Sequence, residues 1–283
     1  GGTRCGARLF DQAGRVLGEG KGGPAIARLG EPAFGEIMKA CRAALDAAGL
    51  GEQSLARVHA GFGLAGAQQD KDRDFILHHV HPFASLAVDT DGYASWLGAF
   101  GGRDGAILIL GTGTAGLAVI GGKRINISGR GAEIGDEGSG MAIGRMAIRR
   151  ALWALDGIIA MTPLGREVLD FFGGSGEAAV TWADAATPGD YARFAPTVFA
   201  HAERRDPLAI EILAEAARDV ERLVARLLDC GAPSIAMIGG VFPKMLPWLA
   251  PVFRPYLVQP EGDAMDGAAL MARQALAMRK GAP

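Results

Sequence analysis

Residues 105–120 read GAILILGTGTAGLAVI, and this stretch decides the fold expected for the chain. The short apolar run 106–110 is bounded by glycine, which predicts a buried strand. A second apolar run, 117–120, follows directly after the Gly-Thr-Gly-Thr of residues 111–114. The pattern predicts a hairpin whose tight turn presents backbone N–H groups and two hydroxyls. Such a turn suits a phosphate, because oriented amides bind anions and glycine lets a ligand approach the backbone closely.

A second glycine-rich motif, Gly-Asp-Glu-Gly-Ser-Gly, occupies residues 135–140. It places Asp136 and Glu137 in a loop before a helix that Ser139 can cap and that ends near Gly157. An exposed acidic loop is the simplest alternative, but the flanking glycines indicate constrained backbone. The two motifs together predict a phosphate cradle beside a polar, carboxylate-lined site.

Composition limits the class of protein. The 283 residues are 49% hydrophobic and 21% charged, with a formal net charge of −2. This length favours two lobes over one domain, and the charge balance argues against nucleic acid as a partner. No apolar run approaches the ~20 residues of a membrane span, so no membrane partner is expected. Cys5, Cys41 and Cys230 are scattered, which favours reduced thiols and a cytoplasmic location.

Strand and helix signals alternate along the chain, which predicts an α/β protein. The expected elements are a hairpin over 8–17, a helix over 36–48, strands over 58–64 and 86–88, a helix over 93–100, a strand over 234–238 and a closing helix over 266–277.

The clearest helix follows Asp206 and Pro207. Apolar residues recur in it at spacings of three and four, which predicts one buried stripe. The stripe comprises Ile210, Leu213, Ala217, Val220, Val224 and Leu227. The charged residues on the other faces are expected to be solvated, namely Glu211, Glu215, Arg218, Glu221 and Arg222.

Glycines recur at the ends of three expected strands, at 61–63, 111–113 and 239–240. Ligands of open α/β sheets bind beyond the carboxyl ends of strands. Three such ends from distant parts of the chain therefore predict one cleft assembled from both halves.

Six short motifs stand in the order typical of a known family. They are Gly1-Gly2-Thr3-Arg4, Thr90-Asp91-Gly92, Gly111-Thr112-Gly113-Thr114, Gly129-Arg130-Gly131, Gly135 to Gly140 and Gly239-Gly240-Val241. In these motifs the chain resembles N-acetylglucosamine and glucosamine kinases of the BadF/BadG/BcrA/BcrD ATPase family. The resemblance implies a two-lobed, ribonuclease H-like fold of the actin-like ATPases, with a cleft between the lobes. The implied lobes are residues 1–103 with a returning helix 266–283, and residues 104–265.

The resemblance makes Asp91 the catalytic base, which takes the proton from the sugar O6 as this oxygen attacks the γ-phosphate of ATP. From the residues alone, Asp91 is equally well a helix-capping aspartate. Asp89 shares a face with Asp91 if the strand continues, so the two carboxylates could exchange roles.

The remaining site residues also follow from the resemblance. The residues expected to contact ATP are Gly2, Thr3, Gly111, Thr112, Gly113, Thr114, Gly239 and Gly240. Those expected to bind the sugar are Gly129, Arg130, Gly131 and Asp136. Mg²⁺ is the implied metal, and the aspartate that helps to hold it is expected upstream of Gly1, in residues missing from this sequence. Relatives are commonly homodimers.

Two departures from the family pattern bear on the acceptor sugar. Kinases of this group often carry Gly-Pro-Ala-Asn after the first hairpin, where this chain has Ile26 in place of the asparagine. Arg130 replaces an aromatic residue in the sugar loop, and its planar cation could pair with a carboxylate. Both changes favour glucosamine or another hexose as an alternative acceptor.

Two further classes compete with the kinase hypothesis. ATPases of the same family that energise radical dehydratases carry a cysteine just before the second phosphate loop, and residues 107–110 contain none. A non-catalytic sugar sensor is the other alternative. Related regulators add a DNA-binding domain, for which this sequence has no segment. The histidines at 78, 79 and 81 lack the further ligands of a zinc site.

Overall fold

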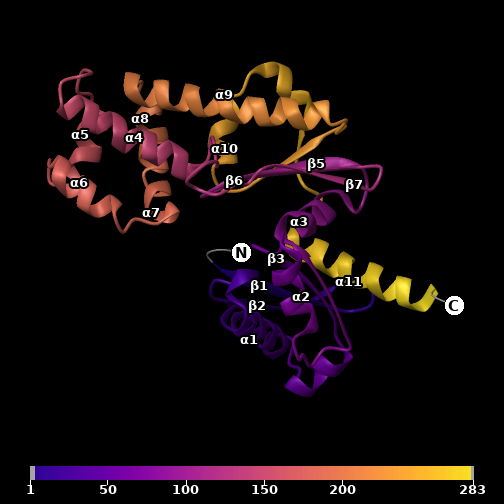
Figure 1. Cartoon of the computed structure of the whole chain (residues 1–283). Helices are drawn as coiled ribbons and strands as arrows, with labels where there is room; N and C mark the ends of the chain where they lie inside the picture. Colours follow the sequence, from indigo (N-terminus) through magenta and orange to yellow (C-terminus); the bar gives the residue numbers. More distant parts are fainter. Residues whose placement is uncertain (1–3, 282–283) are drawn as a thin grey trace. The chain divides into compact units, whose positions relative to one another are not determined.

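The computed structural model describes residues 4–281, and the chain divides into two compact units (Figure 1). Unit 1 comprises Gly1–Arg103 and Pro260–Pro283, and unit 2 comprises Asp104–Gln259. Each unit has a hydrophobic core of its own. None of the helices within the described residues is long and apolar enough to cross a membrane.

Unit 1 is built on two strand pairs. Its elements are β1 (Cys5–Phe10), β2 (Val16–Gly22), a 3₁₀ turn (Ala27–Leu29), α1 (Glu31–Ala47), a second 3₁₀ turn (Glu52–Arg57), β3 (His59–Leu64), α2 (Asp70–His78), β4 (Ser85–Thr90), α3 (Asp91–Phe100) and α11 (Ala264–Gly281). Strands β1 and β2 are antiparallel, whereas β3 and β4 are parallel. Helix α11 packs against α3 and β3, so both ends of the chain contribute to this unit.

Helix α1 approaches strand β2 at very short range. A Cβ atom added to Gly18 would lie 2.2 Å from the carbonyl oxygen of Ala44, and one added to Gly20 would lie 2.0 Å from that of Ala40. Alternate residues of a strand face the same side. Glycine at these positions therefore lets the helix backbone touch the strand backbone.

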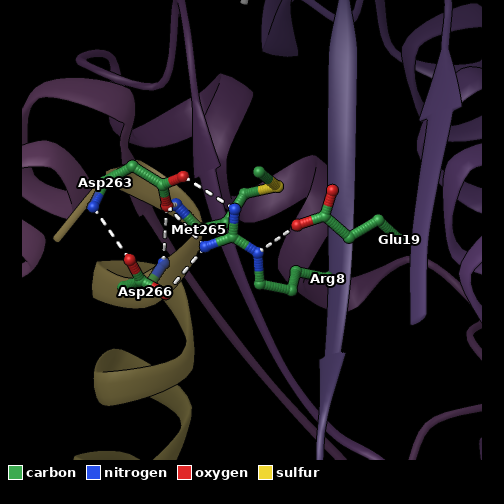
Figure 2. A network of polar contacts seen from close by, with 5 residues as sticks. All are labelled: Arg8, Glu19, Asp263, Met265 and Asp266. Carbon is green, nitrogen blue, oxygen red and sulfur yellow. Dashed lines mark hydrogen bonds and ion pairs between the residues drawn. The ribbon is translucent and has the colours of Figure 1, made fainter. Parts of the chain in front are cut away.

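A polar network fixes the start of α11 to the first hairpin (Figure 2). The guanidinium of Arg8 on β1 donates to Glu19 on β2 at 2.6 Å, to Asp263 at 2.9 Å and to Asp266 at 2.8 Å. Asp263 also accepts the backbone N–H groups of Met265 and Asp266, while Asp266 accepts that of Asp263. This reciprocal capping satisfies N–H groups that the first helical turn leaves unpaired.

Unit 2 contains a mixed five-stranded sheet of order β7-β6-β5-β8-β9. Its strands are β5 (Gly105–Leu110), β6 (Thr114–Ile120), β7 (Lys123–Ser128), β8 (Ile235–Ile238) and β9 (Leu257–Val258). Strand β5 is antiparallel to β6 and parallel to β8. The central position of β5 explains its continuous apolar sequence, because it is covered on both faces.

The rest of unit 2 is mainly helical. Its helices are α4 (Gly140–Leu155), α5 (Pro163–Asp170), α6 (Gly176–Ala183), α7 (Pro188–Ala192), α8 (Ala195–Glu203), α9 (Pro207–Asp229) and α10 (Phe242–Met245), with 3₁₀ turns at Leu246–Trp248 and Pro251–Tyr256. Figure 1 shows α9 running along the sheet, and it also packs on α4 and α8. The α/β class predicted from the sequence is confirmed.

Several element boundaries differ from the prediction. Helix α1 begins at Glu31 and not at residue 36, because Gly30 breaks the preceding turn and Pro32 is well suited to a first helical turn. Strand β4 extends to Thr90 and α3 starts at Asp91. Helix α11 extends beyond the predicted 266–277 at both ends.

The stripe predicted on α9 was wrong at one position. Ile210 is 38% exposed, because the first turn of the helix is buried on the side of Leu208 and Ala209. The other five residues of the stripe are buried. All three glutamates expected to be solvated have protein partners: Glu211 and Glu215 pair with the buried Arg150, and Glu221 accepts the N–H of Ala250.

Candidate active site

The Gly-Thr-Gly-Thr turn joins β5 to β6 and is bonded to the start of α4. The N–H groups of Gly140 and Met141 donate to the carbonyl oxygens of Gly111 and Thr112, at 2.9 and 3.1 Å. The side chain of Thr112 is exposed. The predicted hairpin is thus confirmed, and its turn is held in place by a segment about thirty residues further along the chain.

The Gly-Asp-Glu-Gly-Ser-Gly loop lies against the same turn. Oδ1 of Asp136 accepts the N–H of Thr114 at 3.0 Å, and the hydroxyl of Thr114 donates to the carbonyl of Glu137 at 2.9 Å. A Cβ atom on Gly113 would lie only 2.9 Å from Oδ2 of Asp136. Since Oδ2 accepts no hydrogen bond from the described residues, half of this carboxylate can bind a ligand hydroxyl.

Asp136 has an unusual backbone conformation. Its φ of +64° lies in the left-handed region, which side chains other than those of Asn and Asp rarely adopt. Such conformations persist where surrounding contacts impose them, and they concentrate at functional sites. The bonds to the turn supply such contacts here.

Gly239 and Gly240 end β8 next to the end of β5. Gly239 has a φ of +111°, and a Cβ atom there would lie 2.2 Å from the carbonyl oxygen of Leu110. Val241 donates to that same carbonyl at 3.1 Å. The structure therefore brings together the two glycine-rich strand ends of unit 2 that the sequence analysis singled out.

Two glycines at these strand ends have no structural need to be glycine. Gly111 and Gly240 both have φ outside the left-handed region, and a Cβ atom on either would meet no described atom within 4 Å. A glycine that the fold does not require is expected where a ligand approaches the backbone closely. Both positions leave open space beside the backbone at the ends of β5 and β8.

The N-terminus of α4 is fully occupied by protein groups. Besides the two bonds to the turn, Oγ of Ser139 accepts the N–H of Ala142 at 3.1 Å, and Ile143 donates to the carbonyl of Ser139. The predicted cap at Ser139 is confirmed. An anion would therefore use the turn itself and not the first N–H groups of this helix.

The predicted sugar loop, Gly129 to Gly131, follows β7. Gly129 and Gly131 have φ of +71° and +91°, and the side chain of Arg130 is exposed. A Cβ atom on Gly135 would lie 3.2 Å from Cβ of Arg130. This loop thus lies against the start of the Gly-Asp-Glu-Gly-Ser-Gly motif.

Asp91 belongs to unit 1 and is the first residue of α3. The helix is capped by Thr90, whose Oγ1 accepts the N–H of Tyr93 at 3.0 Å. Within residues 4–281, Oδ1 of Asp91 accepts only the N–H of the adjacent Gly92, at 2.9 Å. The capping role that competed with catalysis for Asp91 is therefore filled by Thr90. The preference of threonine for the position before a helix could have indicated this from the sequence.

The rival carboxylate at Asp89 is bound differently. Its Oδ1 accepts the N–H of Thr90 at 2.8 Å, within strand β4. Asp91 and Asp89 are both half-buried. Gly2 and Thr3, predicted to contact ATP, lie outside the described residues.

No metal centre is preassembled in residues 4–281, where no three His, Cys, Asp or Glu side chains are grouped to hold an ion. His79 lies between aromatic rings instead, with ring centroids 4.2 Å from Phe34 and 5.6 Å from Phe75. The three cysteines are unpaired. Burial raises the pKa of the Cys41 thiol to about 12, which keeps it protonated at neutral pH.

Comparisons with known proteins show the family of this chain. The profile of the BadF/BadG/BcrA/BcrD ATPase family matches residues 1–272. Glucosamine kinase GspK of Vibrio cholerae is 39% identical over 273 residues, which cover 96% of this chain and 93% of that protein. The crystal structure of a putative N-acetylglucosamine kinase from Chromobacterium violaceum is 35% identical, with a TM-score of 0.89 and coverage of 96% and 95%. A glucokinase of the ROK family from Streptomyces griseus, at 22% identity, has a TM-score of 0.57 over 99% of this chain and 97% of that one. This last likeness concerns the fold alone, and the predicted actin-like ATPase fold is confirmed.

Proposed function

The chain belongs to the BadF/BadG/BcrA/BcrD ATPase family, and on that premise we propose that it transfers the γ-phosphoryl group of ATP to the 6-hydroxyl of an amino sugar, N-acetylglucosamine or a near relative. Two relatives above 30% identity are named a glucosamine kinase, from Vibrio cholerae, and a putative N-acetylglucosamine kinase, from Chromobacterium violaceum. Both are covered almost completely by this chain, so the comparison extends to the whole protein.

The convergence of glycine-rich strand ends in unit 2 carries the proposal. Gly111 and Gly240 leave open space where the fold itself would accept a side chain. This supports binding of the ATP phosphates at Gly111 to Thr114 and of the adenosine at Gly239 and Gly240. Gly2 and Thr3 are proposed to complete the phosphate site.

Asp91 is the proposed general base. As the bond between O6 and the γ-phosphorus forms, the bond to the β-phosphate oxygen breaks, ADP leaves, and the proton of the 6-hydroxyl passes to the Asp91 carboxylate. This role requires a carboxylate without a structural task, which fits the capping of α3 by Thr90.

Asp136 is the proposed sugar ligand, through its unpaired Oδ2. A carboxylate oxygen accepts hydroxyl protons well, and the N–H of Thr114 fixes the orientation of Oδ1. Gly129, Arg130 and Gly131 would line the same pocket. Mg²⁺ would be held mainly by phosphate oxygens and water, and it would neutralise the charge that develops on the phosphates.

Glucosamine is the second candidate acceptor, and Ile26 favours it. Cγ2 of Ile26 lies 2.9 Å from the position of a Cβ atom on Gly66, so this side chain is placed against the Gly66 turn. Isoleucine offers no hydrogen bond to an acetamido group. An amino sugar without that group would lose nothing by this replacement.

A homodimer and a cytoplasmic location are proposed with the function. The three unpaired cysteines support a reducing compartment. Light scattering on purified protein tests the dimer, and a monomer at micromolar concentration would contradict it.

The activity is tested by ADP release with Mg·ATP across a panel of sugars. The panel comprises N-acetylglucosamine, glucosamine, glucose, N-acetylmannosamine and a control without sugar. We expect release with one of the two amino sugars well above the control. Equal release in every well would indicate an ATPase, and sugar-dependent thermal stabilisation without release would indicate a sensor.

A further inference from the structure

Thr114 contacts both acidic residues, Asp136 and Glu137, of the Gly-Asp-Glu-Gly-Ser-Gly loop. It is the first residue of β6 and is only 2% exposed. Its N–H donates to Oδ1 of Asp136 at 3.0 Å and its hydroxyl to the carbonyl of Glu137 at 2.9 Å, 22 and 23 positions further along the chain. One buried side chain thus connects the Gly111–Thr114 turn, called the phosphate turn below, to the loop that carries Asp136.

The hydroxyl of Thr114 is already committed within the protein. A buried hydroxyl has one proton to donate, and here Glu137 receives it. In the same turn, the side chain of Thr112 is exposed and has no protein partner within the described residues. The two threonines of the motif therefore have different environments, although each of them follows a glycine in the sequence.

Close contacts restrict the Gly135–Gly140 loop on the side that faces the Gly111–Thr114 turn. A Cβ atom on Gly113 would lie 2.9 Å from Oδ2 of Asp136, so the carboxylate is pressed against the turn. On the other side of the loop, Gly138 approaches Val220 of α9, where a Cβ atom would lie 2.5 Å from Cγ2. Asp136 keeps its left-handed conformation between these two fixed points.

We propose that Thr114 is a positioning residue for sugar binding, which narrows the ATP phosphate contacts proposed above to Gly111, Thr112 and Gly113. Its hydroxyl holds the backbone at Glu137, and thereby Asp136, at a fixed place relative to the phosphate turn. Direct contact with the phosphates then falls to Thr112. This role rests on the proposed function, in which the turn binds ATP and Asp136 binds the sugar.

Loss of the hydroxyl should affect the two substrates differently. Without it, the carbonyl of Glu137 has no donor and the loop relaxes, because an unmade buried hydrogen bond is costly. A small displacement of Asp136 weakens its contact with the sugar, and loss of positioning lowers the rate as well. The phosphate turn keeps its own bonds from Gly140 and Met141.

The test is the variant Thr114→Val, which keeps the shape of the side chain and removes its donor. We expect the KM for the amino sugar to rise about tenfold. The Kd for the ATP analogue AMP-PNP with Mg²⁺, measured without sugar, should change less than about twofold. Thr114→Ser restores the donor and should return the sugar KM close to the wild-type value. If Thr114→Val does not fold, Thr114→Cys, with a weaker donor, carries the same expectation.

Two matched threonine variants serve as controls. Thr112→Val should raise the Kd for AMP-PNP and leave the KM for the amino sugar nearly unchanged, which is the opposite of the effect expected for Thr114→Val. Thr181→Val removes a similar bond, from an exposed hydroxyl to the carbonyl of Glu177 within α6 at 3.0 Å, and should leave both constants unchanged.

Three results would overturn the positioning role. The first is a Thr114→Val variant whose Kd for AMP-PNP rises as much as its KM for the sugar. The second is a Thr114→Val variant in which neither constant changes. The third is a Thr114→Ser variant whose KM for the sugar stays as high as that of Thr114→Val. The wild-type protein separates this role from the proposed function. If the wild type shows no sugar-dependent turnover, the function fails and this role fails with it. If the wild type turns over normally and Thr114→Val has the wild-type KM for the sugar and Kd for AMP-PNP, only the positioning role is contradicted.

Discussion

At the scale of single residues, the functional assignment of Asp91 depends on its neighbour. Aspartate and threonine are both good caps, and here Thr90 caps α3 through its hydroxyl. Asp91 follows as the first helical residue, and its Oδ1 accepts the N–H of Gly92. The two side chains can therefore be tested separately, one for chemistry and one for stability.

Replacing Asp91 by Asn should lower kcat by ~10²–10⁴, because the amide cannot take up the proton of the 6-hydroxyl. The fold should be unaffected, since Thr90 still caps the helix. Thr90→Ala is the matched control. It should lower the free energy of unfolding by about 1 kcal/mol while it retains most of the turnover. Steady-state kinetics and thermal unfolding of both variants decide the point. Unchanged kcat in Asp91→Asn would remove this residue from the mechanism.

Glycines near the site allow a second comparison between neighbours. Gly240→Ala should leave stability unchanged, because its Cβ atom meets nothing within 4 Å among the described residues. The same methyl group should raise the KM for ATP about tenfold by blocking the nucleotide. Gly239→Ala should instead lower the free energy of unfolding by about 3 kcal/mol, since its Cβ atom would strike the carbonyl of Leu110. An unaltered KM for ATP in Gly240→Ala would place the nucleotide elsewhere.

At the scale of elements, the packing of α1 on β2 depends on the absence of side chains. Gly20→Ala would place a methyl carbon 2.0 Å from the carbonyl of Ala40 and should destabilise the protein by about 3 kcal/mol. Gly35 lies in the interior of α1, is exposed and has no atom within 4 Å of an added Cβ. Gly35→Ala should therefore stabilise the protein by about 0.5–1 kcal/mol. Chemical denaturation of both variants measures the difference, and equal effects would contradict this description of the interface.

The start of α11 should show a pH-dependent stability. Partial burial acts to raise the pKa of Asp263, but the N–H of Asp266 and the Arg8 guanidinium outweigh it and lower this pKa below its ordinary value of 3.8. A lowered folded-state pKa contributes stability above the unfolded-state value, and this contribution is lost as the pH falls through the folded-state value.

Arg8→Met tests this network. At pH 7 it should lower the free energy of unfolding by about 1–2 kcal/mol, because the charged hydrogen bonds shown in Figure 2 are lost. The difference between wild type and variant should shrink below about pH 4, where carboxylates become protonated. Denaturation curves between pH 3 and 7 measure it. A difference that is constant over this range would show that Arg8 acts through packing alone.

Sequence patterns predicted strongly periodic or glycine-bounded elements well and long-range contacts poorly. The hairpin at Gly111 to Thr114 and the cap at Ser139 were predicted, because both depend on local preferences. The bond between Thr114 and Glu137 was not, because it joins positions 23 apart whose approach depends on the folded sheet. The exposure of Ile210 was missed for the same reason: helical periodicity does not indicate where the neighbouring elements end.

At the scale of the whole molecule, the chain forms two units, each with its own core. The domain limits expected from the resemblance, residues 1–103 with 266–283 and residues 104–265, stay a prediction. The cleft between the lobes also stays a prediction. We propose that substrates close the lobes, because exclusion of water prevents its competition as phosphoryl acceptor.

The central claim is that phosphate passes from ATP to the 6-hydroxyl of an amino sugar, and ³¹P NMR of the reaction products tests it most directly. With Mg·ATP and glucosamine or N-acetylglucosamine, we expect a new phosphomonoester coupled to the two protons of carbon 6. It should form in step with ADP in the wild type and be nearly absent in Asp91→Asn. ADP accompanied only by inorganic phosphate, or an ester on another carbon, would contradict the account.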